Sequence, residues 1–134
     1  MKIKVQAKTS AKVRSLVYNL LDVFQKIGIP VDGTDRKVER MAKACLAVGK
    51  IKKSFAEALS EENDGFVRTR DIISFENENY GEHISPGSYD DIRRKDLKLL
   101  IEAGIVINSS SKENQATNNP SRGYALSKSF VELL

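Results

Sequence analysis

The segment "SPGSYDDIRRKDLKLLIEAGIVI", residues 85–107, restricts the possible folds more than any other part of the sequence. Its apolar residues have helical spacing as far as Gly104, and "IVIN" then has the short apolar run that is typical of a strand. A loop, "SSSKENQATNNPSR", and a second strand pattern, "GYALS", follow. This order predicts a helix that leads directly into a pair of short strands.

Two amphipathic helices are predicted in the first half of the chain. The first begins at Ser10, whose side chain can cap it, and ends at Gly28. The second begins at Thr34 or Asp35 and ends at Gly49. Their apolar stripes consist of Val13, Leu16, Val17, Leu20, Leu21, Phe24 and Ile27 in the first helix, and Val38, Met41, Ala42, Cys45 and Leu46 in the second.

A winged helix-turn-helix is predicted in the second half. Thr69 can cap a third helix that ends at Gly81, and Ser85 or Ser88 can open the fourth. Two helices with a tight connection, followed by a two-stranded ribbon, have the order of this fold. We therefore expect a mainly α (α+β) protein: a winged helix-turn-helix with additional N-terminal helices, a C-terminal two-stranded wing and a short final helix.

Length and charge favour one domain with a polyanionic partner. The 134 residues suit a single winged-helix domain over 1–134, with a basic helical half at 1–53 and the helix-turn-helix plus wing at 68–134. Residues 1–53 contain 13 Lys and Arg against 4 Asp and Glu, a net charge of +9, whereas the remainder carries −5. Such a basic half favours nucleic acid as a partner. Residues 1–8 alternate apolar and polar side chains, which fits either a short strand or a flexible arm.

Several classes of site and location are disfavoured. Cys45 and His83 are single residues of their type, so neither a disulfide nor a tetrahedral zinc site is expected; Cys45 is predicted to be buried and His83 to lie in a turn. No apolar run approaches the roughly 20 residues that span a bilayer, and no secretory signal is evident. Asp22, Asp35 and Glu39 on the basic helices, with no tryptophan, disfavour a membrane surface. We expect a cytoplasmic protein.

The exposed face of the fourth helix is the predicted DNA-binding surface. On an ideal helical wheel its apolar face holds Leu97, Leu100 and Ile101, and the opposite face holds Asp91, Arg94, Lys95 and Lys98. The second helix of a helix-turn-helix enters the major groove, where an arginine can contact two acceptors of guanine. We therefore predict that Arg94 contacts a base and that Lys95 and Lys98 contact phosphates.

The remaining charges of this helix have alternative interpretations. Arg93 lies nearer the apolar side of the wheel, and we expect it to pair with Asp90 or Asp96 at three-residue spacing. Asp90 and Asp91 lie in the first turn, where they complement the helix dipole. Alternatively, one of them accepts a hydrogen bond from a cytosine amino group.

Additional backbone contacts are predicted at the helix start and in the wing. Ser85, Ser88 and Tyr89 can donate hydrogen bonds to phosphates, although Ser88 can equally be a helix cap. Lys112 and Arg122 flank the loop between the two strands and can follow a DNA backbone or minor groove. Alternatively, these residues belong to an ordinary solvated hairpin loop that makes no contact with DNA.

Four motifs together resemble the N-terminal helix-turn-helix region of the BsuBI/PstI family of type II restriction endonucleases. They are "NYG", "SPGSYDDIRR", "EAGIVIN" and "NNPSRGYALS", and the likeness extends through "DRKVERMAKACLAVGKIK". It covers most of the chain after residue 10. The resemblance implies a module that docks on double-stranded DNA and precedes a separate magnesium-dependent nuclease domain.

In contrast to the full family pattern, we expect no nuclease domain within these 134 residues. Hydrolysis would need clustered carboxylates and a lysine. The chain offers only "PVDG", without a following strand that carries an acidic residue, a spacer and lysine. We therefore expect no catalytic residue and no cofactor in this segment, with Mg²⁺ bound only by the missing catalytic domain.

Three alternatives remain. The core of the fourth helix also resembles DNA-binding domains of bacterial transcriptional regulators, so a regulator or a controller of a restriction system, acting as a homodimer, would fit. A winged helix that contacts another protein is the second alternative, because the second half of the chain is acidic. An intact small nuclease is the third.

Overall fold

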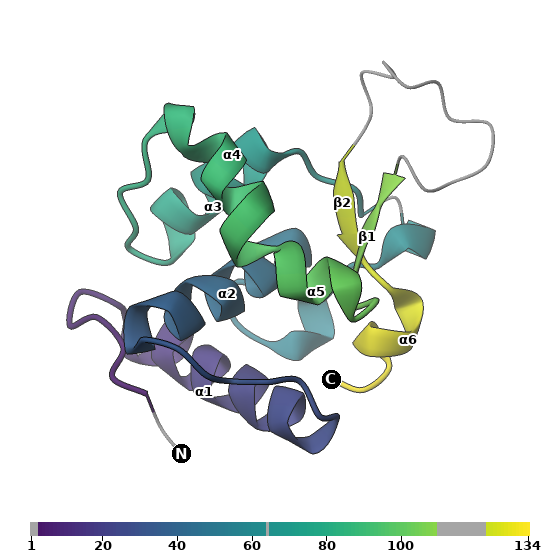
Figure 1. The fold of residues 1–134 in the computed structure, drawn as a ribbon, viewed down its shortest axis with the longest axis horizontal. Helices are drawn as coiled ribbons and strands as arrows, with labels where there is room; N and C mark the ends of the chain where they lie inside the picture. The colour runs from purple at the N-terminus through teal and green to yellow at the C-terminus, as the bar shows by residue number, and fades with distance from the viewer. Residues whose placement is uncertain (1–2, 64, 110–122) are drawn as a thin grey trace.

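The computed structural model describes residues 3–63, 65–109 and 123–134, which form a mainly helical protein with one small sheet (Figure 1). The helices are α1 (Ala11–Lys26), α2 (Asp35–Val48), α3 (Thr69–Asn79), α4 (Tyr89–Asp91), α5 (Lys98–Glu102) and α6 (Lys128–Val131). Short 3₁₀ turns are η1 (Phe55–Glu57), η2 (Glu61–Asn63) and η3 (Pro86–Ser88), and η4 (Ile92–Asp96) is a π-helical turn. Strands β1 (Val106–Asn108) and β2 (Tyr124–Leu126) pair antiparallel, with Ile107 opposite Ala125. The predicted mainly α class and both strands are confirmed.

The first two helices begin where their capping residues predict. The Ser10 hydroxyl accepts a hydrogen bond from the Val13 amide at 3.3 Å, and the Thr34 hydroxyl accepts one from the Lys37 amide at 3.1 Å. These side chains satisfy amide groups that have no partner within the helix. Gly28, with a φ of +84°, takes the chain away from α1 in a conformation that glycine adopts at low cost.

The N-terminal residues form neither of the two structures that were predicted. Residues 3–6 have no regular secondary structure, yet Ile3 and Val5 are buried. The Tyr18 hydroxyl donates to the Ile3 carbonyl oxygen at 3.0 Å, and the Lys4 amide donates to the Asp35 carboxylate at 3.1 Å. The segment is therefore fixed against α1 and α2 by apolar burial and by side-chain partners, which alternation of residue types alone does not reveal.

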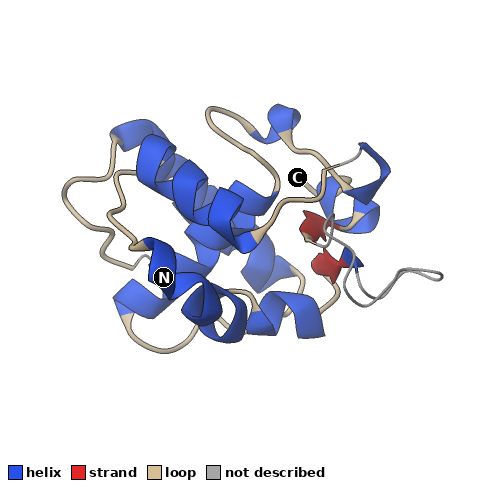
Figure 2. Cartoon of the chain, turned by 90° about the horizontal axis from the view of Figure 1, so that it is seen from above, coloured by secondary structure: helices blue, strands red, loops and turns tan. Residues whose placement is uncertain are grey.

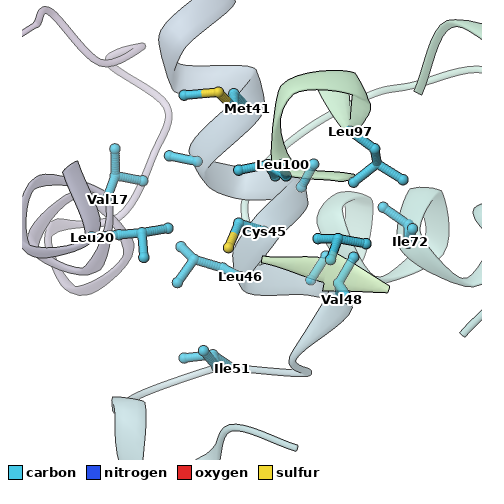
Figure 3. Close-up of a cluster of buried hydrophobic side chains, with 14 of the residues drawn as sticks. Val17, Leu20, Met41, Cys45, Leu46, Val48, Ile51, Ile72, Leu97 and Leu100 are labelled. Atoms are coloured by element: carbon cyan, nitrogen blue, oxygen red, sulfur yellow. The ribbon is translucent and has the colours of Figure 1, made fainter. Parts of the chain in front are cut away.

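Helix α2 lies at the centre of the apolar core (Figure 3). Cys45 and Leu46 face Leu20 of α1 on one side, and Leu100 of α5 approaches from the other. Cys45 is buried as predicted, and burial raises the pKa of its thiol. Seen from above, the two strands lie toward one end of the molecule, next to this helical core (Figure 2). In the described part of the chain, no helix has the length and apolar character needed to cross a membrane.

The N-cap of the third helix lies one residue before the predicted one. Arg68 occupies the N-cap position, and its amide donates to the Asp71 carboxylate at 2.9 Å, so Thr69 is the first helical residue instead of the cap. Just before this helix, Val67 exchanges two backbone hydrogen bonds with Tyr124, each of 2.7 Å. The start of α3 is thereby attached to the edge of the sheet.

The fourth helix is less regular than predicted. Residues 86–102, here called the charged helix, run through η3, α4, η4 and α5 and cross the face of the molecule between α2 and the strands (Figure 1). Ser85 and Ser88 occupy the N-cap positions of η3 and α4, but neither side chain makes a capping hydrogen bond. The two serine hydroxyls instead hydrogen-bond to each other at 2.9 Å.

Candidate nucleic-acid interface

The cations of the charged helix point to solvent. The exposed fraction of the side chain is 57% for Arg93, 67% for Arg94 and 71% for Lys95, and Lys98 is also exposed. The helix is held from behind by the fully buried side chains of Ile92, Leu97 and Leu100. The structure therefore has the predicted orientation, with apolar residues inside and basic residues outside.

The π-helical turn explains why Arg93 does not lie near the apolar side. The Leu97 amide donates to the Ile92 carbonyl oxygen, five residues earlier, at 2.9 Å. This bond adds one residue to the turn, so an ideal wheel gives a wrong rotation for the residues before it. As a result Ile92 and Leu97 both face the core, and Arg93 extends into solvent.

Carboxylates in the first turn hold the arginines and a lysine. Asp90 pairs with Arg93 at 2.7 Å, as predicted, and also with Arg94 at 3.0 Å. The hydrogen bond from Arg93 holds the pKa of Asp90 below its usual value. Asp91 lies 3.7 Å from Lys95. Exposed pairs of this kind contribute little stability, so an incoming phosphate can replace the carboxylate as a partner.

A groove of about 500 Å³ separates the charged helix from the strands, and we call it the strand-side groove. Its lining residues are Arg68, Thr69, Arg70, Pro86, Tyr89, Arg93, Asn108, Gly123 and Tyr124. Tyr89 is 58% exposed here. The start of α3 thus contributes two arginines, Arg68 and Arg70, that were not predicted to belong to the site. The motif "VRTRD", with basic residues around a helix N-terminus, was the available indication.

A second groove of about 800 Å³ lies between the charged helix and α2, and we call it the α2-side groove. Its basic lining residues are Arg36, Lys37, Arg40, Arg94, Lys95 and Lys98, and its acidic ones are Asp32, Asp91, Asp96 and Glu102. Val38, Met41 and Leu99 are among its apolar residues. The basic first half of the chain therefore lies beside the charged helix, and cations line grooves on both of its sides. Lys112 and Arg122, the predicted wing contacts, lie outside the described residues.

A buried ionic cluster connects α2 to the segment before the charged helix. Lys43 is fully buried and donates to Thr9 at 2.9 Å, to Glu39 at 2.6 Å and to Glu82 at 2.8 Å. Arg36 makes two hydrogen bonds to the same Glu82 carboxylate. Burial opposes ionisation of Glu82, but the bonds from Arg36 and Lys43 outweigh it and lower its pKa to about 2. None of these pairings was predicted. Thr9 and Glu82 are far from their partners in the sequence, whereas Glu39 lies four residues before Lys43 in the same helix.

Two further carboxylates extend the cluster under the charged helix. Arg40 donates through Nε and one Nη to the same oxygen of buried Asp96, at 3.2 Å in each case. Glu76 of α3 is also buried, and neither of its oxygens accepts a hydrogen bond from the residues that the structure describes. Burial, reinforced by Asp96 and Glu82, raises the pKa of Glu76 to about 8. The cluster therefore contains two carboxyl groups, those of Asp96 and Glu76, whose ionisation is opposed by burial.

The sequence matches a known protein family. Residues 15–134 match the BsuBI/PstI restriction endonuclease HTH domain. The chain belongs to this family. The BsuBI/PstI HTH domain described here is 23% identical over 122 residues to the type II restriction enzyme BsuBI of Bacillus subtilis. That alignment covers 91% of this chain and 37% of the enzyme, so the chain spans little more than a third of its relative. No solved structure matches.

The donor groups of the HTH domain do not form a metal site in the described residues. Across 3–63, 65–109 and 123–134, no three His, Cys, Asp or Glu side chains are grouped so that they could hold a metal ion. Glu39, Glu82 and Asp96 of the buried cluster are instead engaged by Arg36, Arg40 and Lys43.

Proposed function

We propose that this BsuBI/PstI HTH domain is a winged helix-turn-helix that binds double-stranded DNA with the charged helix in the major groove. The observation that carries the proposal is the outward display of four cations on a helix whose opposite face is buried in the core. A helix of this kind fits the B-DNA major groove, which is about 12 Å wide. Helix α3 would be the first helix of the motif, and β1 and β2 would carry the wing.

The two grooves support this orientation. A helix in the major groove has one sugar-phosphate backbone on each side of it. In the strand-side groove Arg68 and Arg70 are placed for one backbone, and in the α2-side groove Lys37 and Lys98 are placed for the other. The amide groups at the start of α3 add favourable partial charge for a phosphate.

Different roles follow for the residues of the charged helix. Arg94, the more exposed of the two arginines in the surface ion pairs, is proposed to contact a base. Lys95 and Lys98 are proposed to contact phosphates. Arg93 and Tyr89 project into the strand-side groove and join the proposed interface. Ser85 and Ser88 lie at the start of the helix, where their hydroxyls can exchange their mutual hydrogen bond for a phosphate.

At the level of the whole protein, we propose that the domain supplies DNA recognition to a type II restriction enzyme. The family match and the name of the relative support this role. Positioning the enzyme on DNA requires only binding, so no bond is broken by the residues described here. The proposed partner is duplex DNA, and a homodimer would place two charged helices on a palindromic site.

The test is binding to a pool of duplexes with a randomised core, followed by sequencing of the bound fraction. We expect one enriched sequence, and an affinity that falls steeply with salt because phosphate contacts release counterions. Lys98→Ala should weaken binding to all duplexes and reduce the slope of log affinity against log salt by about 0.9, whereas Arg94→Ala should relax selectivity at one position. Lys12→Ala, an exposed lysine of α1 that lines neither of the two grooves, is the matched control.

The same experiment distinguishes the alternatives. Absence of binding, or an affinity that does not change with salt, would contradict the proposal and favour a protein-interaction module. Enrichment of a palindrome together with a dimeric mass in solution would indicate a paired domain, as in a regulator. Enrichment of an asymmetric site with a monomeric mass would indicate a single recognition unit.

A further inference from the structure

The pairing of Arg40 with Asp96 joins α2 to the irregular turn of the charged helix. Asp96 is the last residue of η4, and its side chain is only 8% exposed, although it lies on a helix that is otherwise charged toward solvent. Arg40 reaches it from α2, 56 positions earlier in the sequence, with two hydrogen bonds of 3.2 Å. A carboxylate that stayed ionised in this position without such a partner would be strongly destabilising.

The π-helical turn needs an explanation, because a regular α-helix is the lower-energy conformation for most sequences. In η4 the Leu97 amide bonds to Ile92, and this arrangement turns Asp96 inward, next to Leu97 and toward α2. If this turn were a regular α-helix, the residues before Leu97 would be rotated about the helix axis, relative to the residues after it, compared with their positions in the π-helical turn. Asp96 would then lose its position opposite Arg40, or the cations at 93–95 would change their direction.

We infer that Arg40 and Asp96 are positioning residues that keep the charged helix in its π-helical form, and thereby fix the direction in which Arg93, Arg94 and Lys95 are presented to DNA. The pair acts through the backbone: the Asp96 carboxylate is buried, and the Arg40 side chain that holds it is only 28% exposed, where it lines the α2-side groove. The inference rests on the proposed function, since presentation matters only if this helix reads DNA. It predicts that loss of the pair impairs selectivity more than it impairs general affinity.

The decisive variant removes both charges together. Arg40→Met with Asp96→Leu replaces the ion pair by apolar side chains, a change that is often neutral or stabilising because no single buried charge remains. We expect this double variant to unfold at a temperature close to that of the unsubstituted protein. Its preference for the selected duplex over a scrambled duplex should nevertheless fall at least tenfold, whereas its affinity for scrambled duplex, to which Arg40 can contribute from the α2-side groove, should fall by less than tenfold. If its preference equals that of the unsubstituted protein, the pair has only a structural role and the inference is wrong.

A second measurement needs no DNA. Asp96→Asn keeps the size of the side chain but weakens its bond to Arg40, so the Leu97 amide should exchange with solvent at least tenfold faster, whereas amides of α1 should be unaffected. Asp22→Asn, an exposed aspartate of α1, is the matched control and should leave the Leu97 amide unchanged. Unaltered exchange at Leu97 in Asp96→Asn would contradict the inference even if the domain bound no DNA, so its failure can be separated from failure of the proposed function.

Discussion

Glu76 provides the most quantitative test of how the buried ionic cluster affects stability. Its carboxylate is buried on α3, accepts no hydrogen bond from the described residues, and has a pKa raised from 4.5 to about 8, chiefly by burial. In the unfolded chain the same group ionises at its ordinary value. Between pH 4.5 and 8 the folded state therefore binds more protons than the unfolded state.

The sign of the effect follows from this difference in proton binding. The stabilisation from protonated Glu76 is fully present below pH 4.5 and is lost as the pH rises toward 8, with a slope of up to about 1.4 kcal/mol per pH unit. Over the whole interval the loss has an upper bound of about 5 kcal/mol. Glu82 has the opposite dependence but in another range: its pKa is lowered to about 2, so its contribution is lost only as the pH falls below the ordinary carboxylate range.

Glu76→Gln should remove the part of the pH dependence of stability that arises from Glu76 between pH 4.5 and 8. The variant cannot ionise, but its buried amide still lacks a partner, which costs about 1–3 kcal/mol. We therefore expect the variant to be more stable than the unsubstituted protein by about 2–4 kcal/mol at pH 8, and of similar or lower stability at pH 5.

Urea unfolding measured at half-unit steps from pH 5 to 8.5 gives the required free energies. The informative quantity is the difference between the two proteins at each pH, because other titrating groups contribute equally to both. Glu78→Gln, at an exposed position of the same helix, is the control and should follow the profile of the unsubstituted protein. A constant difference between Glu76→Gln and the unsubstituted protein across this range would refute the argument, since it would mean that Glu76 does not titrate between these values.

Two further predictions concern packing. Leu100→Ala should lower the free energy of unfolding by about 2–5 kcal/mol, because Leu100 is fully buried between the charged helix and α2; urea unfolding checks this, and a loss below 1 kcal/mol would contradict it. Gly123→Ala should destabilise the attachment of Val67 to the sheet, because the added Cβ would lie 2.5 Å from the Val67 carbonyl oxygen. Faster amide exchange at Val67 and Tyr124 is expected in that variant, and unchanged exchange would show that the backbone adjusts without breaking the pair.

The helices and strands were predictable where local chemistry determines them. Ser10 and Thr34 cap the helices that they were expected to cap, because a hydroxyl at the N-cap bonds to the amide three residues later whatever the tertiary environment. The strands at 106–108 and 124–126 likewise lie where their apolar runs predicted them. The cap at Thr69 was wrong because the reach of the Asp71 carboxylate to the Arg68 amide moved the helix start by one residue.

The parts of the site that could not be predicted depend on contacts between distant residues. The direction of Arg93 was misjudged because the π-helical turn depends on where Asp96 can be neutralised, and its partner Arg40 lies on another helix. The contribution of Arg68 and Arg70 depends on the bridge between Val67 and Tyr124, which places the start of α3 beside the strands. Periodicity describes one helix at a time and contains no information about such juxtapositions.

The exposed carboxylates and the buried ones have different consequences for DNA binding. Asp90 and Asp91 lie at the surface, so their pairs with Arg93, Arg94 and Lys95 are weak and can be exchanged for phosphate or base contacts without a large cost. Asp96 and Glu82 are buried and paired with arginine or lysine, so breaking those pairs would leave a charge away from water. In the proposed complex the surface pairs would let the arginines exchange partners, while the buried pairs would hold the helix backbone in place. Because the surface pairs are screened by salt and the buried pairs are not, added salt should weaken binding through the contacts to DNA while the shape of the charged helix stays unchanged.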